Sequence, residues 1–578
     1  MPNFTLAKYS IDNFRRSLAS IDSIPQFALL GIASGLATGL IIVAFRALVD
    51  LPLQFFRTQG YEDFENLPLE YIFLLPLSGS ILLAILYKCL KPDHIRVGVI
   101  HVFERLARHQ GHLPLKNVLT QFFAGAIALS TGHSGGREGP AIHLGAACSS
   151  LLGQSLKLPN NSIRVLVGCG AAAAISASFD TPIAGVIFSM EVIMMEYTIA
   201  GFIPVILAAV TASLITQSVY GNDPAFVVPA GVSMQSLYEI PFLILQGVII
   251  GTIAAIFIHL VMFMNKHAPK THWRRLLLAG LCTATIALIS PAILGVGYDT
   301  VESALSGELV LTILLVTLFF KLVATALTIA LGVPVGVIGP TLFIGAVSGG
   351  ILGSIGAMFF PELANSTAFY VILGMGAMMG AVLQAPLAAL MAVMELSHSS
   401  DIILPAMLII IVANMTASHV FNLKSIYMMQ MDMLGLEYRQ NPLSMALNRA
   451  SVASIMHRSY ERVSMVQTRA ALIALVQRKP QWIIVDDAEL KKPAYILPLT
   501  DLASALDDRN KEQFDLNEIP ASRRDLTSIL LQATLKEAYD KLEETGVQAL
   551  YVNRISAPLV DSVAGLILKE DIESYYQS

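Results

Sequence analysis

The sequence predicts an all-α protein that crosses a membrane many times, followed by a polar α/β tail. Two observations predict this class: 55% of the 578 residues are hydrophobic and only 14% are charged, whereas soluble globular chains carry about 25% charged residues. The third observation is the uneven distribution of charge, because 34 of the 79 charged residues lie within 451–578. A long membrane region, 27–440, therefore precedes a tail of ordinary polarity, 450–578.

Seven apolar runs give the membrane region its expected spans, because each approaches or exceeds the ~20 residues that a helix needs to cross a bilayer. These runs are 27–56, 70–90, 202–220, 240–264, 275–295, 308–331 and 402–421. Shorter apolar pieces, interrupted by Gly and Pro, lie at 114–131, 140–153, 162–178, 182–196, 340–360, 367–383 and 386–396. We expect these pieces not to be simple spans. Non-helical backbone at membrane depth is tolerated only inside protein or along a watery cavity, so they mark the working part.

The two ends of the chain carry signals for sidedness. The N-terminal segment, 1–26, is polar and shows no pattern of a cleavable signal peptide. Lys8, Arg15 and Arg16 flank the first apolar run, which places this segment in the cytoplasm by the positive-inside rule. The tail is too polar to cross the membrane easily. We therefore expect both termini on the cytoplasmic side of the cell membrane.

Two blocks of the membrane region occur twice in the same order. "GREGPAIHLGA" (136–146) is similar to "GVIGPTLFIGA" (336–346). "AAAAISASFDTPIAGVIFSMEV" (171–192) is similar to "GMGAMMGAVLQAPLAALMAVMEL" (374–396). The two blocks repeat at nearly the same offset, which indicates an internal duplication. Paired segments interrupted by Gly and Pro, one in each half of a membrane protein, are typical of transporter binding sites.

The glycine-rich breaks of the first block predict an anion site. Pro is favoured at the first position of a helix, so we expect one helix to start near Pro140 and a second near Pro340. A helix start presents free N–H groups and roughly half a positive charge. Two such starts at mid-membrane would bind an anion without a lysine, and weakly enough to release it.

Arg137 and Glu138 are the charged residues of the first break. A carboxylate beside an anion site competes with the anion for the same N–H donors, and protonation removes this attraction. Glu138 is therefore a candidate gate that responds to pH or carries a proton. The alternative interpretation is a surface turn with both side chains in water. However, the second copy of the break, "GVIGP", carries no charge. A pair of surface turns would not explain why the same break is repeated with one charged and one apolar copy.

Three stretches, "GREGPAIHLG", "GVIGPTLFIGA" and "TPIAGVIFSMEV", resemble signatures of the CLC chloride channel and transporter family. The resemblance covers roughly residues 30–440. It implies a homodimer in which each subunit has one anion pathway and two inverted repeats of tilted and broken helices, about 30–220 and 240–430. It also implies that Glu138 is the gate. The anion contacts that it implies are Gly136, Arg137, Gly139, Val337, Ile338, Gly339 and the hydroxyl group of Tyr427.

The sequence departs from the family pattern at two places. The serine of the usual GSGIP motif aligns with Val97 in "RVGVIHV" (96–102), so one hydroxyl donor is missing from the anion-binding set, and this weakens or retunes chloride selectivity. The second, inward-facing glutamate of proton-coupled members aligns with Val192, which cannot relay a proton. The resemblance therefore favours a channel. Glu196, expected one turn further on the same helix, is an alternative proton carrier, whereas we expect Glu191 to be structural.

Other polar side chains near the expected pathway have simpler interpretations. We expect His101, His133 and His143 to be hydrogen-bonded wall residues rather than ligands. We expect Lys116 and Lys321 to pair with acidic groups or to extend toward the membrane surface. The sequence shows no metal-ligand spacing among its cysteines, and we expect no metal and no cofactor.

The tail contains two similar units with the order β-α-β-β-α, at about 450–510 and 520–578. This pair resembles a tandem CBS domain. Asp501 and Asp571 fit the aspartate of nucleotide-binding CBS units, but the accompanying hydroxyl positions fall on Pro498 and Leu568. We therefore expect the pair to act as a scaffold rather than as a site for adenine nucleotide.

The sequence thus predicts a permease for chloride, or a similar small anion, and not an enzyme. A proton-coupled chloride antiporter is the alternative within this class. An intramembrane enzyme using Glu138 with His133 or His143 would lack a nucleophile or metal and would leave the repeat unexplained. A cation transporter would need clustered acidic residues at mid-membrane, where each half offers isolated glutamates. The net charge of −5 gives no footprint for nucleic acid.

Overall fold

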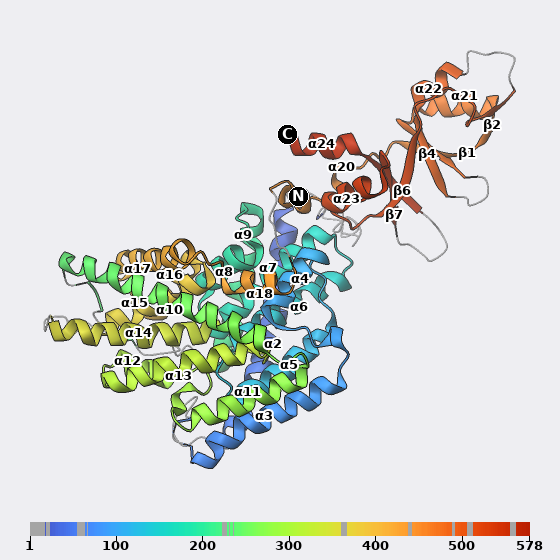
Figure 1. The fold of residues 1–578 in the computed structure, drawn as a ribbon. Coiled ribbons are helices and arrows are strands. Elements are labelled where there is room, and N and C mark those ends of the chain that lie inside the picture. The colour runs from blue at the N-terminus through green and yellow to red at the C-terminus, as the bar shows by residue number, and fades with distance from the viewer. Residues whose placement is uncertain are drawn as a thin grey trace. The chain divides into compact units, whose positions relative to one another are not determined.

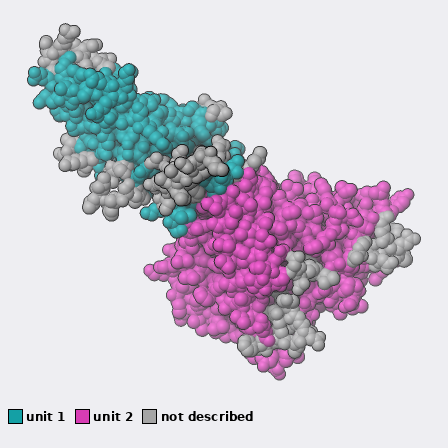
Figure 2. Space-filling view, turned by 180° about the vertical axis from the view of Figure 1, so that it is seen from behind, with its two compact units in different colours: residues 1–26, 155–163, 439–578 teal, residues 27–154, 164–438 magenta. Residues whose placement is uncertain are grey.

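The chain forms two compact units, which Figure 2 shows in different colours. The membrane unit consists of residues 27–154 and 164–438, and the tail unit of residues 1–26, 155–163 and 439–578. The computed structural model describes residues 18, 23–54, 64–65, 67–221, 228–229, 232–234, 236–359, 367–436, 442–487, 492–505, 512–554 and 562–577. Most of the segment 1–26, including Lys8, Arg15 and Arg16, lies outside the described residues, as does the junction 437–441.

The membrane region consists of helices joined by short non-helical stretches, with no strand among its described residues (Figure 1). Its helices are α2 (Ile24–Gln54), α3 (Leu69–Cys89), α4 (Gly98–Arg108), α5 (Leu115–Ser130), α6 (Glu138–Ser155), α7 (Asn160–Phe179), α8 (Pro182–Phe188), α9 (Ile199–Tyr220), α10 (Ile240–His267), α11 (His272–Ala287), α12 (Tyr298–Leu305), α13 (Leu311–Ala330), α14 (Ile338–Phe359), α15 (Thr367–Leu383), α16 (Pro386–Ser397), α17 (Ile403–Met415) and α18 (Ile426–Met433). Short π-helices, Ser189–Met194 and Thr416–Val420, continue α8 and α17.

Eight of the described helices are long and apolar enough to cross a membrane. Six of them correspond to expected spans. The other two, α7 and α14, were expected to be interrupted but are continuous helices of 20 and 22 residues. Their Gly and Ala residues permit close packing rather than breaking the helix, since both helices are mostly buried within the protein. Conversely, the expected span 275–295 ends early at Ala287, because a turn follows and Pro291 cannot continue the helix.

Equivalent glycines let equivalent helices approach closely in the two halves. A methyl group at Gly145 of α6 would lie 2.3 Å from the carbonyl oxygen of Gly170 in α7. A methyl group at Gly345 of α14 would lie 2.3 Å from the carbonyl oxygen of Gly374 in α15. Any side chain larger than the hydrogen atom of glycine would displace the backbone at these two contacts. The two repeats found in the sequence therefore pack their equivalent helices in the same way.

Two glutamates connect the repeats through reciprocal helix caps. The Glu191 carboxylate accepts hydrogen bonds of 3.3 and 2.7 Å from the N–H groups of residues 387–388, in the first turn of α16. The Glu395 carboxylate accepts bonds of 2.9 and 2.7 Å from the N–H groups of residues 183–184, in the first turn of α8. A carboxylate at a helix start satisfies unpaired N–H groups and the helix dipole. This arrangement agrees with the structural role expected for Glu191.

The tail region has the repeated β-α-β-β-α order that its sequence predicts. Its strands are β1 (Tyr460–Ser464), β2 (Val466–Thr468), β3 (Trp482–Asp486), β4 (Pro493–Pro498), β5 (Gln513–Asp515), β6 (Arg524–Leu530), β7 (Ala549–Arg554) and β8 (Ser562–Leu568). Its helices are α19 (Pro442–Arg449), α20 (Val452–Ile455), α21 (Arg469–Arg478), α22 (Leu499–Ala505), α23 (Leu535–Thr545) and α24 (Lys569–Gln577).

One six-stranded sheet joins the two halves of the tail, in the order β1-β3-β4-β6-β7-β8. In the first half β1 runs parallel to β3, and β3 runs antiparallel to β4. In the second half β6 runs parallel to β7, and β7 runs antiparallel to β8. The parallel pairs require crossover helices, which are α21 and α23. This strand-rich region fits a CBS domain pair.

The two aspartates of the tail units have protein partners. Asp501 accepts a hydrogen bond of 2.8 Å from the N–H of Ser522. Asp571 accepts one of 2.9 Å from the N–H of Leu568 and lies 3.0 Å from Nε2 of His457. Both carboxylates therefore stabilise local turns and helix starts of the tail.

Candidate functional site

The two glycine-rich breaks meet in space, although 200 residues separate them in the chain. The N–H of Gly136 donates to the carbonyl oxygen of Gly336 at 2.9 Å, and the N–H of Gly336 donates to that of Gly136 at 2.6 Å. These two bonds form an isolated antiparallel bridge between equivalent positions of the two repeats. The bridge brings the starts of α6 and α14 together.

Glu138 lies between these helix starts. Its side chain is completely buried, and its Oε2 accepts a hydrogen bond of 3.2 Å from the N–H of Gly339, the second residue of α14. Glycines make the necessary room: a methyl group at Gly136 would lie 1.9 Å from Oε2, and one at Gly339 would lie 2.8 Å from Oε1. The first repeat thus inserts its carboxylate into the helix start of the second.

Both helices begin two residues before the predicted positions. α6 starts at Glu138 and α14 at Ile338, so that Pro140 and Pro340 occupy the third helical position instead of the first. Proline is tolerated there because N–H groups in the first turn have no carbonyl partner within the helix. The correction matters for the site, because Glu138 belongs to the first helical turn itself.

The backbone donors predicted in the second motif lie at this junction. Val337 immediately precedes α14 and Ile338 begins it, and both side chains are buried. The first bond of this helix runs from the N–H of Thr341 to the carbonyl of Val337. N–H groups before that point, including that of Gly339, have no carbonyl partner in their own helix. They provide the donor set that an anion requires.

Tyr427 adds a hydroxyl group from α18. It is buried, its ring lies 5.9 Å from that of Phe103 in α4, and it interacts electrostatically with Glu138. The helix that carries it starts at a cap in which Ser425 Oγ accepts the N–H of Met428. Among the described residues the Tyr427 hydroxyl has no hydrogen-bond partner. It is therefore available to a ligand.

Val97 occupies the N-cap position of α4, with an extended backbone and no side-chain cap. The next N–H, of Gly98, donates to Oε1 of Gln121 at 2.8 Å, and Nε2 of Gln121 donates to the carbonyl of Pro334 at 3.4 Å. The start of α4 therefore lacks a hydroxyl group and has one N–H occupied by a glutamine. Gln121 was not among the predicted site residues, although a polar residue in the apolar run 114–131 is a signal.

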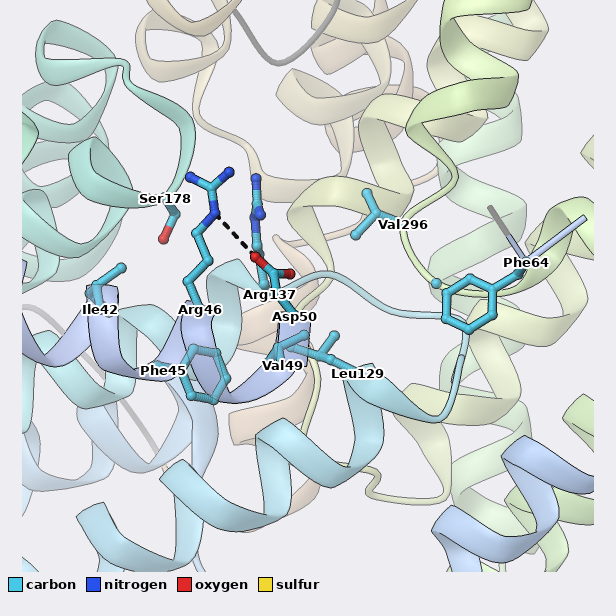
Figure 3. Close-up of a pocket in the computed structure, with 11 residues that line it drawn as sticks. Ile42, Phe45, Arg46, Val49, Asp50, Phe64, Leu129, Arg137, Ser178 and Val296 are labelled. Atoms are coloured by element: carbon cyan, nitrogen blue, oxygen red, sulfur yellow. Dashed lines mark ion pairs between the residues drawn. The ribbon is translucent and has the colours of Figure 1, made fainter. Parts of the chain in front are cut away.

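Arg137 points toward a small cavity rather than into the bridge between the helix starts. Its guanidinium lies 5.5 Å from the ring centre of Tyr298. The cavity, of about 30 Å³, is also lined by Arg46 and Asp50 of α2 (Figure 3). Neither of these was a predicted site residue. The available signal was their charge within the apolar run 27–56, where charged residues are costly.

The histidines form hydrogen bonds in the interior, as expected for wall residues. Nδ1 of His101 lies 2.9 Å from Nε2 of His143, and Nε2 of His133 lies 3.1 Å from Oγ of Ser80. Lys116 is exposed. The expected extension of Lys321 toward the surface is wrong.

Lys321 is fully buried, and its ammonium donates to three carbonyl oxygens at 2.9–3.1 Å. These belong to residues 293–296, and the ammonium also lies 4.4 Å from the ring centre of Phe343. A buried cation is tolerated because its three hydrogens have acceptors. Lys321 thereby fastens the loop that walls the cavity beside Arg137.

Val192 is buried in the π-helix that ends at Met194. The expectation that Glu196 lies on the same helix is wrong, because Met195 adopts a left-handed conformation, with φ 51°, and turns the chain. Glu196 follows this turn outside any helix, and its N–H donates to the carbonyl oxygen of Met190 at 3.0 Å. Its side chain is therefore not displaced by one helical turn from Val192.

The repeated helices and the paired helix starts define a multi-pass membrane transport protein. Residues 79–418 match the model of the family described as voltage gated chloride channel. This match covers more than half of the chain, so the protein belongs to that family, the CLC family, as its motifs predicted. Its members transport anions and are not enzymes, and the protein is therefore an anion transport protein.

Two relatives show how far the similarity extends. One relative, from Ralstonia nicotianae, carries the name "Putative chloride channel protein ClcB-like". It is 29% identical over 412 residues, which are 69% of this chain and 94% of the relative. The H(+)/Cl(−) exchange transporter ClcA of Vibrio cholerae is 29% identical over 303 residues. That match covers 51% of this chain and 64% of the relative, somewhat less than two thirds of its length.

Solved structures share the fold. A slow cyanobacterial Cl−/H+ antiporter has a TM-score of 0.64 at 21% identity, with 72% of this chain and 99% of that chain covered. A eukaryotic CLC transporter has a TM-score of 0.57 at 17% identity, with 96% and 98% covered. The second comparison extends over the tail as well as the membrane region.

Proposed function

We propose that this protein passes chloride, or a similar small anion, through a pathway past the starts of α6 and α14, and that Glu138 gates it. The observation that carries the proposal is the position of the Glu138 carboxylate, which accepts the Gly339 N–H inside a cradle of glycines. The carboxylate is an anion that the protein itself supplies. When it is protonated or displaced, the same donors can bind a free anion.

The proposed anion contacts have different roles. The N–H groups of Gly139, Val337, Ile338 and Gly339 and the hydroxyl of Tyr427 are the donors. Gly136 uses its N–H in the bridge to Gly336 and therefore shapes the site. Arg137 adds positive potential from the side. Val97 stands where a serine would donate a further hydrogen bond, and this absence retunes selectivity among small anions.

Within this function we propose passage without proton coupling. The reason is Val192, which stands where a proton relay toward Glu138 needs a titratable group. The second candidate is Cl−/H+ exchange, which is favoured by the names of the Vibrio relative and of the cyanobacterial structure. An exchanger of this sequence would need another proton route, because the chain turns between Val192 and Glu196.

Two further features belong to the proposal. The family resemblance implies a homodimer with one pathway in each subunit. We also propose that both termini lie in the cytoplasm; the support is the positive charge of Lys8, Arg15 and Arg16 before the first apolar run and the polarity of the tail. The tail then acts as a scaffold on that side.

The test is flux from liposomes that contain the purified full-length protein. A chloride gradient is imposed, and chloride and proton movements are recorded together with and without a potassium ionophore. We expect chloride efflux without uphill proton movement. Proton uptake driven by the chloride gradient would establish exchange instead of passive passage. Vesicles that release no chloride, bromide or nitrate would overturn the proposed function.

A further inference from the structure

A small cavity lies beside the gate and is lined by two arginines. Arg46 of α2 and Arg137 both line it (Figure 3). Apolar side chains form much of the remaining wall, with Gly295, Val296 and the hydroxyl-bearing Ser178. The volume of about 30 Å³ exceeds the ~10–15 Å³ that one water needs. The cavity therefore has room for a small, largely dehydrated ion.

Both guanidinium groups are held by aromatic rings. Arg46 lies 4.0 Å from the ring centre of Tyr220, whose hydroxyl is anchored to the carbonyl of Val43 at 3.2 Å. Arg137 lies 5.5 Å from that of Tyr298. A guanidinium held over a ring keeps its N–H groups directed outward in its own plane. Planar donors positioned in this way are suited to an anion.

One carboxylate, Asp50, offsets part of this charge among the described lining residues. Its Oδ2 lies 3.6 Å from Nε of Arg46, and both side chains are about one fifth exposed. At 3.6 Å this contact is longer than the charge-assisted hydrogen bonds of a close ion pair. A mobile anion can therefore compete with Asp50 for the Arg46 guanidinium.

The cavity adjoins the wall of the gate. Val296 lines it, and Cγ1 of Val296 would lie 2.9 Å from a methyl group placed at Gly339, the residue that binds the Glu138 carboxylate. Arg137 is the residue directly before Glu138. An anion in the cavity would repel the Glu138 carboxylate and would be the nearest replacement for it.

We propose that this cavity is an anion-capture site, in which Arg46 and Arg137 hold a small monovalent anion beside Glu138 before it enters the pathway. The inference rests on the proposed function and adds Arg46 and Asp50 to it. Halides and nitrate fit the chemistry, since the donors are cationic and the walls are otherwise apolar. Asp50 sets the affinity by competing with the anion.

The experiment uses bromide as the probe, because its anomalous scattering identifies it in crystals of the full-length protein. We expect a bromide peak within hydrogen-bonding distance of Arg46 and Arg137, and its loss in Arg46→Gln. Chloride flux is then measured in planar bilayers with chloride varied on one face at a time. On one face only, Arg46→Gln should raise the half-saturating chloride concentration roughly fivefold, the order expected for a partly exposed ionic contact.

Two further variants keep the test independent of folding. Asp50→Asn removes the competing carboxylate and should lower the half-saturating concentration, whereas Arg46→Lys should retain most of the wild-type behaviour. Arg164→Gln, an arginine of the membrane unit that binds the carbonyl of Leu106, is the matched control. Normal flux with no bromide in the cavity, and no effect of Arg46→Gln or Asp50→Asn, would overturn the capture site but leave the proposed function intact. Absence of anion flux in the wild type would overturn the proposed function itself.

Discussion

Glu138 is held at a helix start, the position where we propose that a free anion binds. The residue that binds it, Gly339, comes from the other repeat, so the carboxylate interacts with a helix start that is not its own. Burial without a cationic side chain would be costly for a carboxylate. The helix starts lessen this cost with partial positive charge. A site of this kind can exchange its bound carboxylate for another anion.

We predict that Glu138→Gln removes the pH dependence of anion flux and raises flux at neutral and alkaline pH several-fold. The amide is close in shape to the carboxylic acid but stays uncharged, so it is not attracted to the helix starts as a carboxylate is. The measurement is chloride efflux from liposomes between about pH 4.5 and 8.5. In the wild type, flux should rise as the pH falls, because protonation neutralises Glu138.

Glu308→Gln is the control for that measurement, since Glu308 is exposed and lies in the segment between α12 and α13. It should retain the wild-type profile. If Glu138→Gln conducts with an unchanged pH profile, Glu138 is not the gate.

A functional residue could be predicted from the sequence where its side chain was unusual for the residues around it in the chain. Glu138 was one such residue, because it is a carboxylate on a glycine-rich break within an apolar region. Arg46 was not recognised, because its partner Arg137 is 91 positions away and only the fold places them at one cavity. Lys321 was misplaced because a lysine that is fully bound by carbonyls has the same sequence signal as one that reaches the surface.

At the scale of elements, each repeat completes the helices of the other. Glu191 caps α16 and Glu395 caps α8, while the bridge at Gly136 and Gly336 aligns α6 with α14. The caps use charge-assisted hydrogen bonds, which are stronger than neutral ones. The two halves are thus joined by polar contacts at helix ends as well as by apolar packing.

We predict that Glu191→Gln and Glu395→Gln each lower the stability of the membrane unit by about 1 kcal/mol, the order of a lost helix cap. An amide still accepts one hydrogen bond but lacks the charge that complements the helix start. Thermal unfolding in detergent, followed by intrinsic fluorescence, measures the effect. Glu302→Gln, on the exposed face of α12, is the matched control and should unfold like the wild type.

Transport separates this structural role from a functional one. Both variants should retain the pH profile and the anion selectivity of the wild type. A variant of either glutamate with normal thermal stability but altered proton or anion selectivity would contradict the structural assignment.

Element boundaries were less predictable than element identity. The helix starts were correctly associated with the two breaks, but they lie two residues earlier than proline preferences indicate, because the first turn tolerates Pro at several positions. α7 and α14 were expected to be interrupted, since Gly marks both flexible breaks and tight helix contacts. The close approach of Gly145 to Gly170 shows the second use, which no local pattern in a single sequence distinguishes.

At the scale of the whole molecule, the two candidate functions differ in whether protons accompany the anion. Proton transfer across the membrane unit needs titratable groups at successive depths, whereas passage of anions needs only donors. Val192 breaks such a series where the family resemblance places an inner glutamate. The chain turns before Glu196, the residue expected as the alternative proton carrier.

We predict that Val192→Glu introduces proton coupling, seen as proton uptake driven by a chloride gradient in liposomes. Val192 is buried, so the new carboxylate will favour its protonated form and will supply the titratable group that the family resemblance places at this position. Val192→Gln, which adds similar bulk without a titratable proton, is the control and should remain uncoupled. Coupling in the unmodified protein would show that another route exists and that Val192 does not decide the mechanism.

The bridge between Gly136 and Gly336 also has a consequence for biosynthesis. The carboxylate, its glycine cradle and its donor arise from segments 200 residues apart, so a nascent chain that ends within the first repeat has no complete anion site. Until residues 336–339 have been inserted, the first half offers Glu138 no partner from α14 and no paired helix starts. The paired helix starts can therefore form only after the second repeat has been inserted.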